Sequence, residues 1–109
     1  MKKDVNNLKN LLKDNFEIVT LIKPQFEAGK EDVGNGVIKD YKIHIKILDS
    51  LLEFFEENGF VLVGLTFSPI QGPKGNIEYL AHLKPEGEKL EIDVKEFVKN
   101  TFESFNITQ

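Results

Sequence analysis

Lys23 and Glu78 are the two residues of this sequence whose types and settings could do chemistry together. Lys23 lies in the string LIKPQFE at residues 21–27, and Glu78 lies in the string SPIQGPKGNIEY at residues 68–79. A lysine amine accepts a proton near neutral pH only where burial or a second ammonium lowers its pKa. A glutamate beside it opposes that shift and orients the amine, so we assign Glu78 to positioning. The more common role of such a pair is an exposed ion pair worth under about 1 kcal/mol.

Three apolar, β-branched runs are predicted to be the strands that carry these residues. The first, at residues 16–22, lacks clean alternation and is stopped by Pro24, which is typical of a strand covered on both faces. The other two cover residues 60–67 and residues 77–84. The lysine therefore follows the first strand, and the glutamate opens the third.

Apolar residues at helical spacing predict three helices. One covers residues 4–14, and the clearest covers residues 41–58, with Asp40 as its cap and Gly59 at the left-handed stop position. A third, amphipathic helix follows Asp93 near the end of the chain.

The order of these elements predicts how the strands pair. A strand, a helix and a strand of this length imply a right-handed crossover between parallel strands. The link at residues 69–75 is too short for another crossover, so the third strand runs against the first two. If it inserts beside the first strand, Lys23 and Glu78 meet at one edge of the sheet, where ligands bind in open α/β sheets. The predicted fold class is α/β, ordered helix, strand, helix, strand, antiparallel strand and terminal helix, as at the end of a Rossmann-like methyltransferase sheet.

The composition excludes several classes of protein. The 109 residues suit one domain or part of one, with 40% hydrophobic residues for a modest core. Cysteine is absent, and the two histidines are interpreted as a solvated helix residue, His44, and a packed strand residue, His82, so we expect no metal site. No apolar stretch approaches the roughly 20 residues that cross a bilayer, and the start is unlike a signal peptide. We therefore expect a cytoplasmic protein without a membrane partner.

Charge argues against nucleic-acid binding by this chain alone. All 14 basic residues are lysines, and the 18 acids leave a net charge of −4, whereas an autonomous nucleic-acid binder usually carries a basic face. Residues 85–109 hold six acids and three lysines and so carry most of the imbalance. We divide the chain into residues 1–84 and an acidic tail at residues 85–109 that holds the terminal amphipathic helix.

The strings around the two charged residues resemble a known family. They are Leu21–Glu27 followed by Ala28-Gly29-Lys30 and Asp32-Val33-Gly34, then Ser68-Pro69-Ile70, Gly72-Pro73 and Gly75–Tyr79. These strings, at these separations, are similar to the TlyA (hemolysin A) family, whose members are ribosomal RNA 2′-O-methyltransferases with an FtsJ-like catalytic domain. The resemblance covers roughly residues 5–84.

The resemblance implies a cofactor, a partner and a set of site residues. Family members use S-adenosylmethionine, act on ribosomal RNA, and methylate the 2′-hydroxyl with a lysine, an aspartate, a second lysine and a glutamate. Lys23 corresponds to the second lysine and Glu78 to the glutamate, which makes them the candidate catalytic residues. Ser68, Asn76 and Lys30 are candidate substrate contacts, although polar side chains in turns mostly satisfy backbone groups.

The sequence lacks the features that would hold the cofactor. A nucleotide-type cofactor needs a strand followed by a glycine-rich turn that opens into a helix. Gly34-Asn35-Gly36, within the predicted loop at residues 27–40, meets neither condition. The first lysine, the aspartate and the family's amino-terminal RNA-binding module are absent too. We interpret the chain as the carboxyl-terminal half of the catalytic domain, inactive alone and with no cofactor bound.

Two other functions and one assembly are also considered. The chain could be a non-catalytic RNA- or protein-interaction module. The family's older name also suggests pore formation, which the lack of a basic, deeply apolar helix disfavours. The strand at residues 16–22 would lack a neighbour, and an unpaired apolar strand promotes association. We predict a homodimer through this edge or through exchange of the terminal helix, unless residues 90–105 cover the edge.

Overall fold

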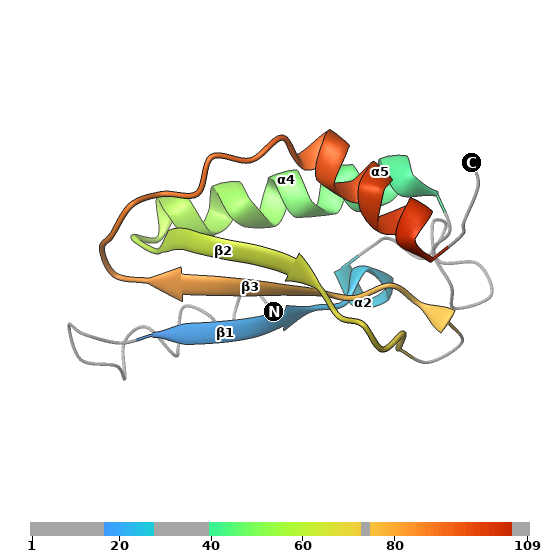
Figure 1. Cartoon of the computed structure of the whole chain (residues 1–109). Helices are drawn as coiled ribbons and strands as arrows, with labels where there is room; N and C mark the ends of the chain where they lie inside the picture. Colours follow the sequence, from blue (N-terminus) through green and yellow to red (C-terminus); the bar gives the residue numbers. More distant parts are fainter. Residues whose placement is uncertain (1–16, 28–39, 73–74, 106–109) are drawn as a thin grey trace.

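The computed structural model describes residues 17–27, 40–72 and 75–105. Its elements, in chain order, are β1 (Ile18–Ile22), α2 (Pro24–Glu27), α4 (Tyr41–Glu57), β2 (Val61–Phe67), β3 (Tyr79–Lys84) and α5 (Val94–Ser104). The strands form one sheet, and the two long helices pack against it (Figure 1). The helix predicted at residues 4–14 and most of the loop predicted at residues 27–40 lie outside the described residues.

The sheet has the predicted strand directions. Its order is β1-β3-β2, and β3 runs antiparallel to both neighbours, so β1 and β2 point the same way. The central position of β3 places it beside the first strand, which is the condition under which the sequence brings Lys23 and Glu78 to one edge of the sheet. At one end of the ladder, Tyr79 pairs with Ile22 on one side and with Phe67 on the other.

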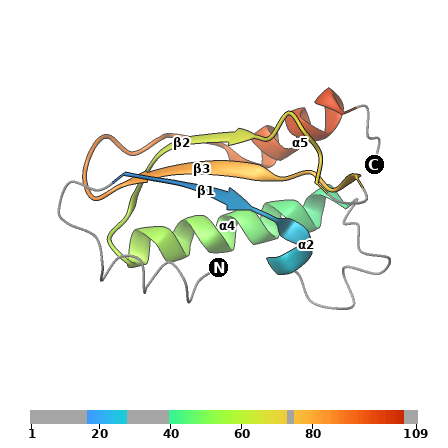
Figure 2. The same cartoon turned by 90° about the horizontal axis from the view of Figure 1, so that it is seen from below.

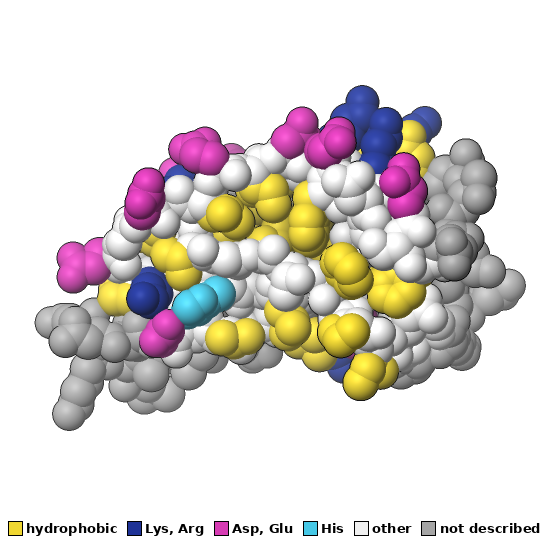
Figure 3. Space-filling view, viewed as in Figure 1, with side chains coloured by type: hydrophobic (Ala, Val, Ile, Leu, Met, Phe, Trp, Pro, Cys, Tyr) yellow, Lys and Arg dark blue, Asp and Glu magenta, His cyan; other side chains and the backbone are white. Residues whose placement is uncertain are grey.

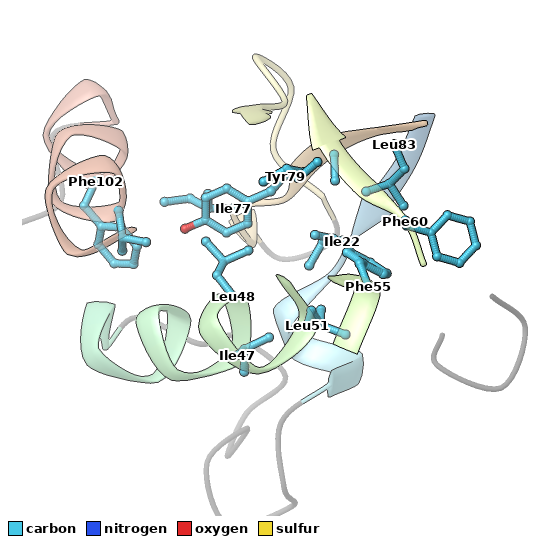
Figure 4. Close-up of a cluster of buried hydrophobic side chains, with 13 residues drawn as sticks. Ile22, Ile47, Leu48, Leu51, Phe55, Phe60, Ile77, Tyr79, Leu83 and Phe102 are labelled. Atoms are coloured by element: carbon cyan, nitrogen blue, oxygen red, sulfur yellow. The ribbon is translucent and has the colours of Figure 1, made fainter. Parts of the chain in front are cut away.

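Helix α4 begins and ends as the sequence predicts. The Asp40 carboxylate accepts a hydrogen bond of 2.9 Å from the backbone N–H of Lys42, which satisfies one of the free donors at the helix start. Gly59 follows the last turn with φ of 81°, a conformation that favours glycine. The buried face of the helix packs on the inner face of the sheet, as Figure 4 shows, through the side chains Ile47, Leu48, Leu51 and Phe55.

Helix α5, in the acidic tail, belongs to the same core. Asp93 caps its start by accepting a hydrogen bond from the N–H of Glu96. Val98 and Phe102 are 0% and 2% exposed and join the hydrophobic core with the residues of α4 and the sheet. The change of composition at residue 85 is therefore not a boundary in the packing.

The two long helices cover the same face of the sheet. His44 of α4 and Phe97 of α5 both contact the ring of Tyr79 on β3, with ring centroids 5.6 and 5.8 Å away. Figure 2 shows both helices beside the strands with α5 away from β1, so the predicted option that residues 90–105 cover the edge of the first strand is wrong. Helix α5 packs on α4 instead, because its apolar stripe meets the apolar stripe of that helix.

The expectation that the first strand is covered on both faces is also wrong. Ile22 is 0% exposed, but Val19 and Leu21 are 66% and 38% exposed. Their side chains alternate with the buried ones, and the described helices lie on the opposite face of the sheet. Figure 3 shows hydrophobic side chains gathered over the open part of the sheet, with acidic side chains along the upper outline.

Both histidines differ from their predicted settings. His44 is 1% exposed rather than solvated, because α4 turns it toward the sheet, where its Nδ1 lies 2.7 Å from the Tyr79 hydroxyl. The side chain of His82 is 36% exposed rather than packed, because it lies on the open face of β3. There its Nε2 lies 2.6 Å from a carboxylate oxygen of Glu17.

Candidate active site

The end of the sheet brings together residues from three neighbouring strands. Ile22, Tyr79 and Phe67 form the last rung of the ladder. One position further, Lys23 follows β1 and Glu78 precedes β3. Ser68 follows β2, and its N–H donates to the carbonyl of Glu78 at 2.8 Å. The strand register therefore places the lysine and the glutamate at the same end of the sheet.

The two candidate residues have different immediate surroundings. Glu78 is buried, with 6% of its surface exposed, and its Oε2 accepts a 2.9 Å hydrogen bond from the side-chain amide of Gln25. Lys23 is half-buried, and its ammonium lies 5.3 Å from the centre of the Phe26 ring. Within the described residues, no ion pair joins Lys23 to Glu78. The direct partner of the glutamate is thus the glutamine two residues after the lysine, which the sequence interpretation missed.

The loop between β2 and β3 closes over the glutamate. A Cβ added at Gly72 would collide with Oε2 of Glu78, so the backbone approaches the carboxylate as closely as only a glycine allows. The loop is held by hydrogen bonds from the N–H of Gly72 to Asn76 and from the N–H of Gly75 to Gly72. Gly75 has φ of 80°, which explains a second glycine in this turn.

The candidate substrate contacts fall into three situations. The Ser68 hydroxyl donates to the carbonyl of Ile70 at 2.8 Å and accepts from its N–H at 3.3 Å, so it shapes its own turn. Asn76 is 3% exposed and lies two residues before Glu78 in the chain. Lys30 lies outside the described residues. Of the two described candidates, Ser68 is half-exposed and Asn76 is buried.

Beneath the glutamate lies a buried hydrogen bond that the sequence did not predict. Tyr79 is 0% exposed, and its hydroxyl pairs with Nδ1 of His44 at 2.7 Å. Burial raises the pKa of the Tyr79 hydroxyl well above its usual value of about 10. The pair ties α4 to the first residue of β3, next to Glu78.

This tyrosine predicts a pH dependence of stability. In the unfolded chain the phenol loses its proton near pH 10, whereas the folded chain retains it. Below that pH both states keep the proton, so this hydroxyl adds no pH dependence to the free energy of unfolding. Above it, the free energy of unfolding falls by up to about 1.4 kcal/mol per pH unit, because the unfolded state binds fewer protons. Urea unfolding between pH 9 and pH 11 should show this slope in the wild type and a shallower one in Tyr79→Phe. Tyr41→Phe serves as the control, and equal slopes in all three proteins would contradict the prediction.

A hollow of about 380 Å³ lies away from this sheet end, between α4 and the segment that leads from β3 to α5. Its lining includes the acids Asp49, Glu53, Glu56 and Glu91 beside apolar side chains. An acidic lining repels RNA phosphates, so we assign it no role in the reaction.

The described residues do not fit a nucleotide-type cofactor. Such a group needs a glycine-rich turn between a strand and the start of a helix. Here β1 runs through Lys23 directly into α2, and the described glycines near the site lie in the connection between two strands. Across the described residues, no cluster of three or more metal-ligating side chains is present. In the same part of the chain, no helix has the length and apolar character needed to cross a membrane.

The fold and the sheet end define the class of this protein: an α/β protein built like the closing part of a Rossmann-like methyltransferase sheet. The chain belongs to the FtsJ-like methyltransferase family, whose model matches residues 2–85. This confirms the resemblance seen in the sequence.

Individual relatives agree with this assignment. YqxC of Bacillus subtilis, a candidate rRNA methyltransferase, is 45% identical over 82 residues, which are 74% of this chain and 29% of that protein. The 16S/23S rRNA (cytidine-2′-O)-methyltransferase TlyA of Mycobacterium tuberculosis is 38% identical over 74 residues, or 67% of this chain and 28% of TlyA. A solved structure of a candidate hemolysin from Streptococcus thermophilus superposes with a TM-score of 0.86 at 41% identity. That superposition covers 96% of this chain and 39% of the solved chain, and this chain spans 29% of YqxC and 28% of TlyA.

Proposed function

We propose that this chain supplies the RNA-facing part of the active site of an S-adenosylmethionine-dependent ribosomal RNA 2′-O-methyltransferase of the TlyA type. The observation that carries the proposal is the strand register, which sets Lys23 and Glu78 one position beyond the same rung of the sheet. The family match over residues 2–85 supports it.

In this proposal the two residues act on the acceptor hydroxyl. S-adenosylmethionine supplies an activated methyl group, so the remaining task is to align the ribose 2′-hydroxyl and remove its proton. Lys23, which is half-exposed at the end of the sheet, contacts the hydroxyl. Glu78, buried and held by Gln25, orients the lysine and the ribose from behind. Ser68, Asn76 and Lys30 remain candidate contacts to the RNA.

Under this proposal, the isolated chain is expected to be inactive. The described residues provide no seat for the cofactor, and the chain spans 28% of TlyA. Calorimetry with S-adenosylmethionine and the isolated chain should therefore show no binding. Cofactor binding by this chain alone would contradict the proposal that the chain supplies only the RNA-facing part of the active site.

The test of the function itself is a chimera. The 74-residue segment of TlyA that matches this chain is replaced by the corresponding residues of this chain. We expect the chimera to transfer labelled methyl groups from S-adenosylmethionine to ribosomal RNA transcripts. TlyA itself is the positive control, and calorimetric cofactor binding shows that the chimera is folded. A folded, cofactor-binding chimera without methyl transfer would exclude the proposed function.

A role in protein association is the second candidate, because the two edges of the sheet differ. The outer edge of β2 is partly covered, since the N–H of Leu90 donates to the carbonyl of Leu62 at 2.8 Å. Among the described residues, strand β1 pairs with β3 on one side and with no strand on the other, and Val19 and Leu21 are exposed on its open face. An uncovered apolar edge is a template for pairing. Helix α5 packs in its own core, which favours edge pairing over helix exchange as the route to a homodimer.

We expect multi-angle light scattering to give the mass of a dimer at micromolar concentrations. Val19→Lys combined with Leu21→Lys should shift the chain to monomer, because charged side chains block edge pairing and hydrophobic contact. Ile70→Lys, on a side chain that is 78% exposed in the connection between β2 and β3, is the control and should leave the dimer intact. A wild-type chain that stays monomeric at 100-fold higher concentration would refute the assembly.

A further inference from the structure

Gln25 is a buried polar side chain next to the candidate site. Gln25 lies in α2, the single helical turn directly after β1, and is 9% exposed. Pro24 begins the turn, and the N–H of Phe26 closes it by donating to Lys23 at 2.9 Å. The turn thus points the lysine and the glutamine, which are two residues apart, in different directions. The glutamine goes inward and meets Glu78, which is 53 residues further along the chain.

The carboxylate of Glu78 is fixed from two sides. Gln25 Nε2 donates to its Oε2 at 2.9 Å, and the backbone of Gly72 closes against the same oxygen. Within the described residues, its other oxygen, Oε1, accepts no hydrogen bond. A hydrogen bond to a charged acceptor is roughly twice as strong as one between neutral groups. One carboxylate oxygen is therefore immobilised while the other keeps its acceptor capacity.

The carbonyl of Gln25 supplies an independent observation. Its Oε1 is buried and has no hydrogen-bond partner among the described residues. Buried polar atoms in folded proteins nearly always have a partner, so a glutamine selected for stability alone would be a poor choice here. An apolar side chain of the same length would fill the space without an unpaired acceptor. What the glutamine adds is the donor to Glu78.

We propose that Gln25 is a positioning residue of the methyltransferase site: its amide holds Glu78 in the orientation that the acceptor hydroxyl and Lys23 require. The inference rests on the proposed function, and it assigns to Gln25 the task of setting a neighbouring group rather than touching the substrate. It also explains why the lysine and the glutamine stand two residues apart. The turn directs Lys23 toward the substrate and Gln25 toward the carboxylate of Glu78.

The contact is tested first in the isolated chain, with a double-mutant cycle built from Gln25→Met and Glu78→Gln. Gln25→Met keeps the length of the side chain and removes the donor. We expect it to lower the folding equilibrium constant roughly tenfold in the wild-type background and less than threefold when Glu78→Gln is present. If Gln25→Met lowers the folding equilibrium constant by the same factor with and without Glu78→Gln, the two side chains do not interact, and the proposal is overturned.

The positioning role is tested in the active chimera. There, Gln25→Met should lower kcat at least tenfold and leave the KM for RNA within twofold, because Glu78 is misaligned while the RNA-binding surface is unchanged. Gln71→Met, which removes another loop amide that bonds the carbonyl of Gly75, is the matched control and should keep kcat within threefold. A normal kcat in the Gln25→Met chimera overturns the positioning role and leaves the function standing. A chimera that is inactive before any substitution overturns both.

Discussion

Replacing Lys23 by methionine in the TlyA chimera is expected to lower kcat about 10²- to 10⁴-fold, the range for loss of a positioned proton acceptor. Methionine keeps the unbranched length of the side chain and removes the amine. The Lys23 ammonium contacts a single described ring, Phe26, so its loss should leave the fold intact. Single-turnover methyl transfer under saturating cofactor measures the chemical step directly.

Lys46→Met is the control for that experiment, because Lys46 is an exposed lysine on α4 and does not belong to the strand ends that carry Lys23 and Glu78. It should change kcat less than twofold and affect mainly the salt dependence of RNA binding. If both lysine variants lose the same fraction of activity, Lys23 acts as a general positive charge and not at the reacting hydroxyl.

Replacing Phe102 by alanine is expected to destabilise the isolated chain by about 3–5 kcal/mol, the usual cost of emptying a buried aromatic site. Phe102 is 2% exposed, and its ring packs edge-to-face on His44 and Tyr41, with centroids 4.9 and 6.4 Å away. Since His44 bonds Tyr79, the cavity would also loosen the contact beneath Glu78. Chemical denaturation followed by circular dichroism measures the change.

Ile70→Ala is the control for the stability measurement, because Ile70 is 78% exposed. Its substitution should stay within about 0.5 kcal/mol of the wild type. A loss below 1 kcal/mol for Phe102→Ala would mean that the acidic tail is a separate unit, as its composition alone suggests.

The parts of the fold that depend on local signals could be predicted from the sequence. Helix α4 has a capping aspartate before it and a glycine after it, and both act as the sequence indicates. The antiparallel third strand followed from a connection too short for a crossover. These features are decided by residues close together in the chain, so no knowledge of distant contacts was needed.

The parts that were missed depend on partners far away in the sequence. Pro24 was interpreted as the end of a strand, but it also opens α2, since proline is well suited to the first position of a helix. The burial of His44 requires the hydroxyl of Tyr79, and the role of Gln25 requires the carboxylate of Glu78. Neither pair leaves a periodic signal, because each contact joins elements that meet only when the sheet has formed.

The candidate site shows the same division. The residue types and their strings identified Lys23 and Glu78, and the strand register brings both to one end of the sheet. Their immediate neighbours, Gln25 and Gly72, were not singled out. A glycine whose missing Cβ makes room for a carboxylate cannot be told from an ordinary turn glycine without coordinates.

The central place of β3 has a consequence for synthesis on the ribosome. Among the described strands, β1 and β2 do not pair with each other, and each pairs with β3, which follows both of them in the chain. Until Lys84 has left the exit tunnel, β1 and β2 lack the strand that lies between them, and apolar strands with unsatisfied backbone groups tend to aggregate or recruit chaperones. Translation that stops before Tyr79 would release a product that cannot form this sheet, whereas the helix that follows needs only to dock on a sheet already closed.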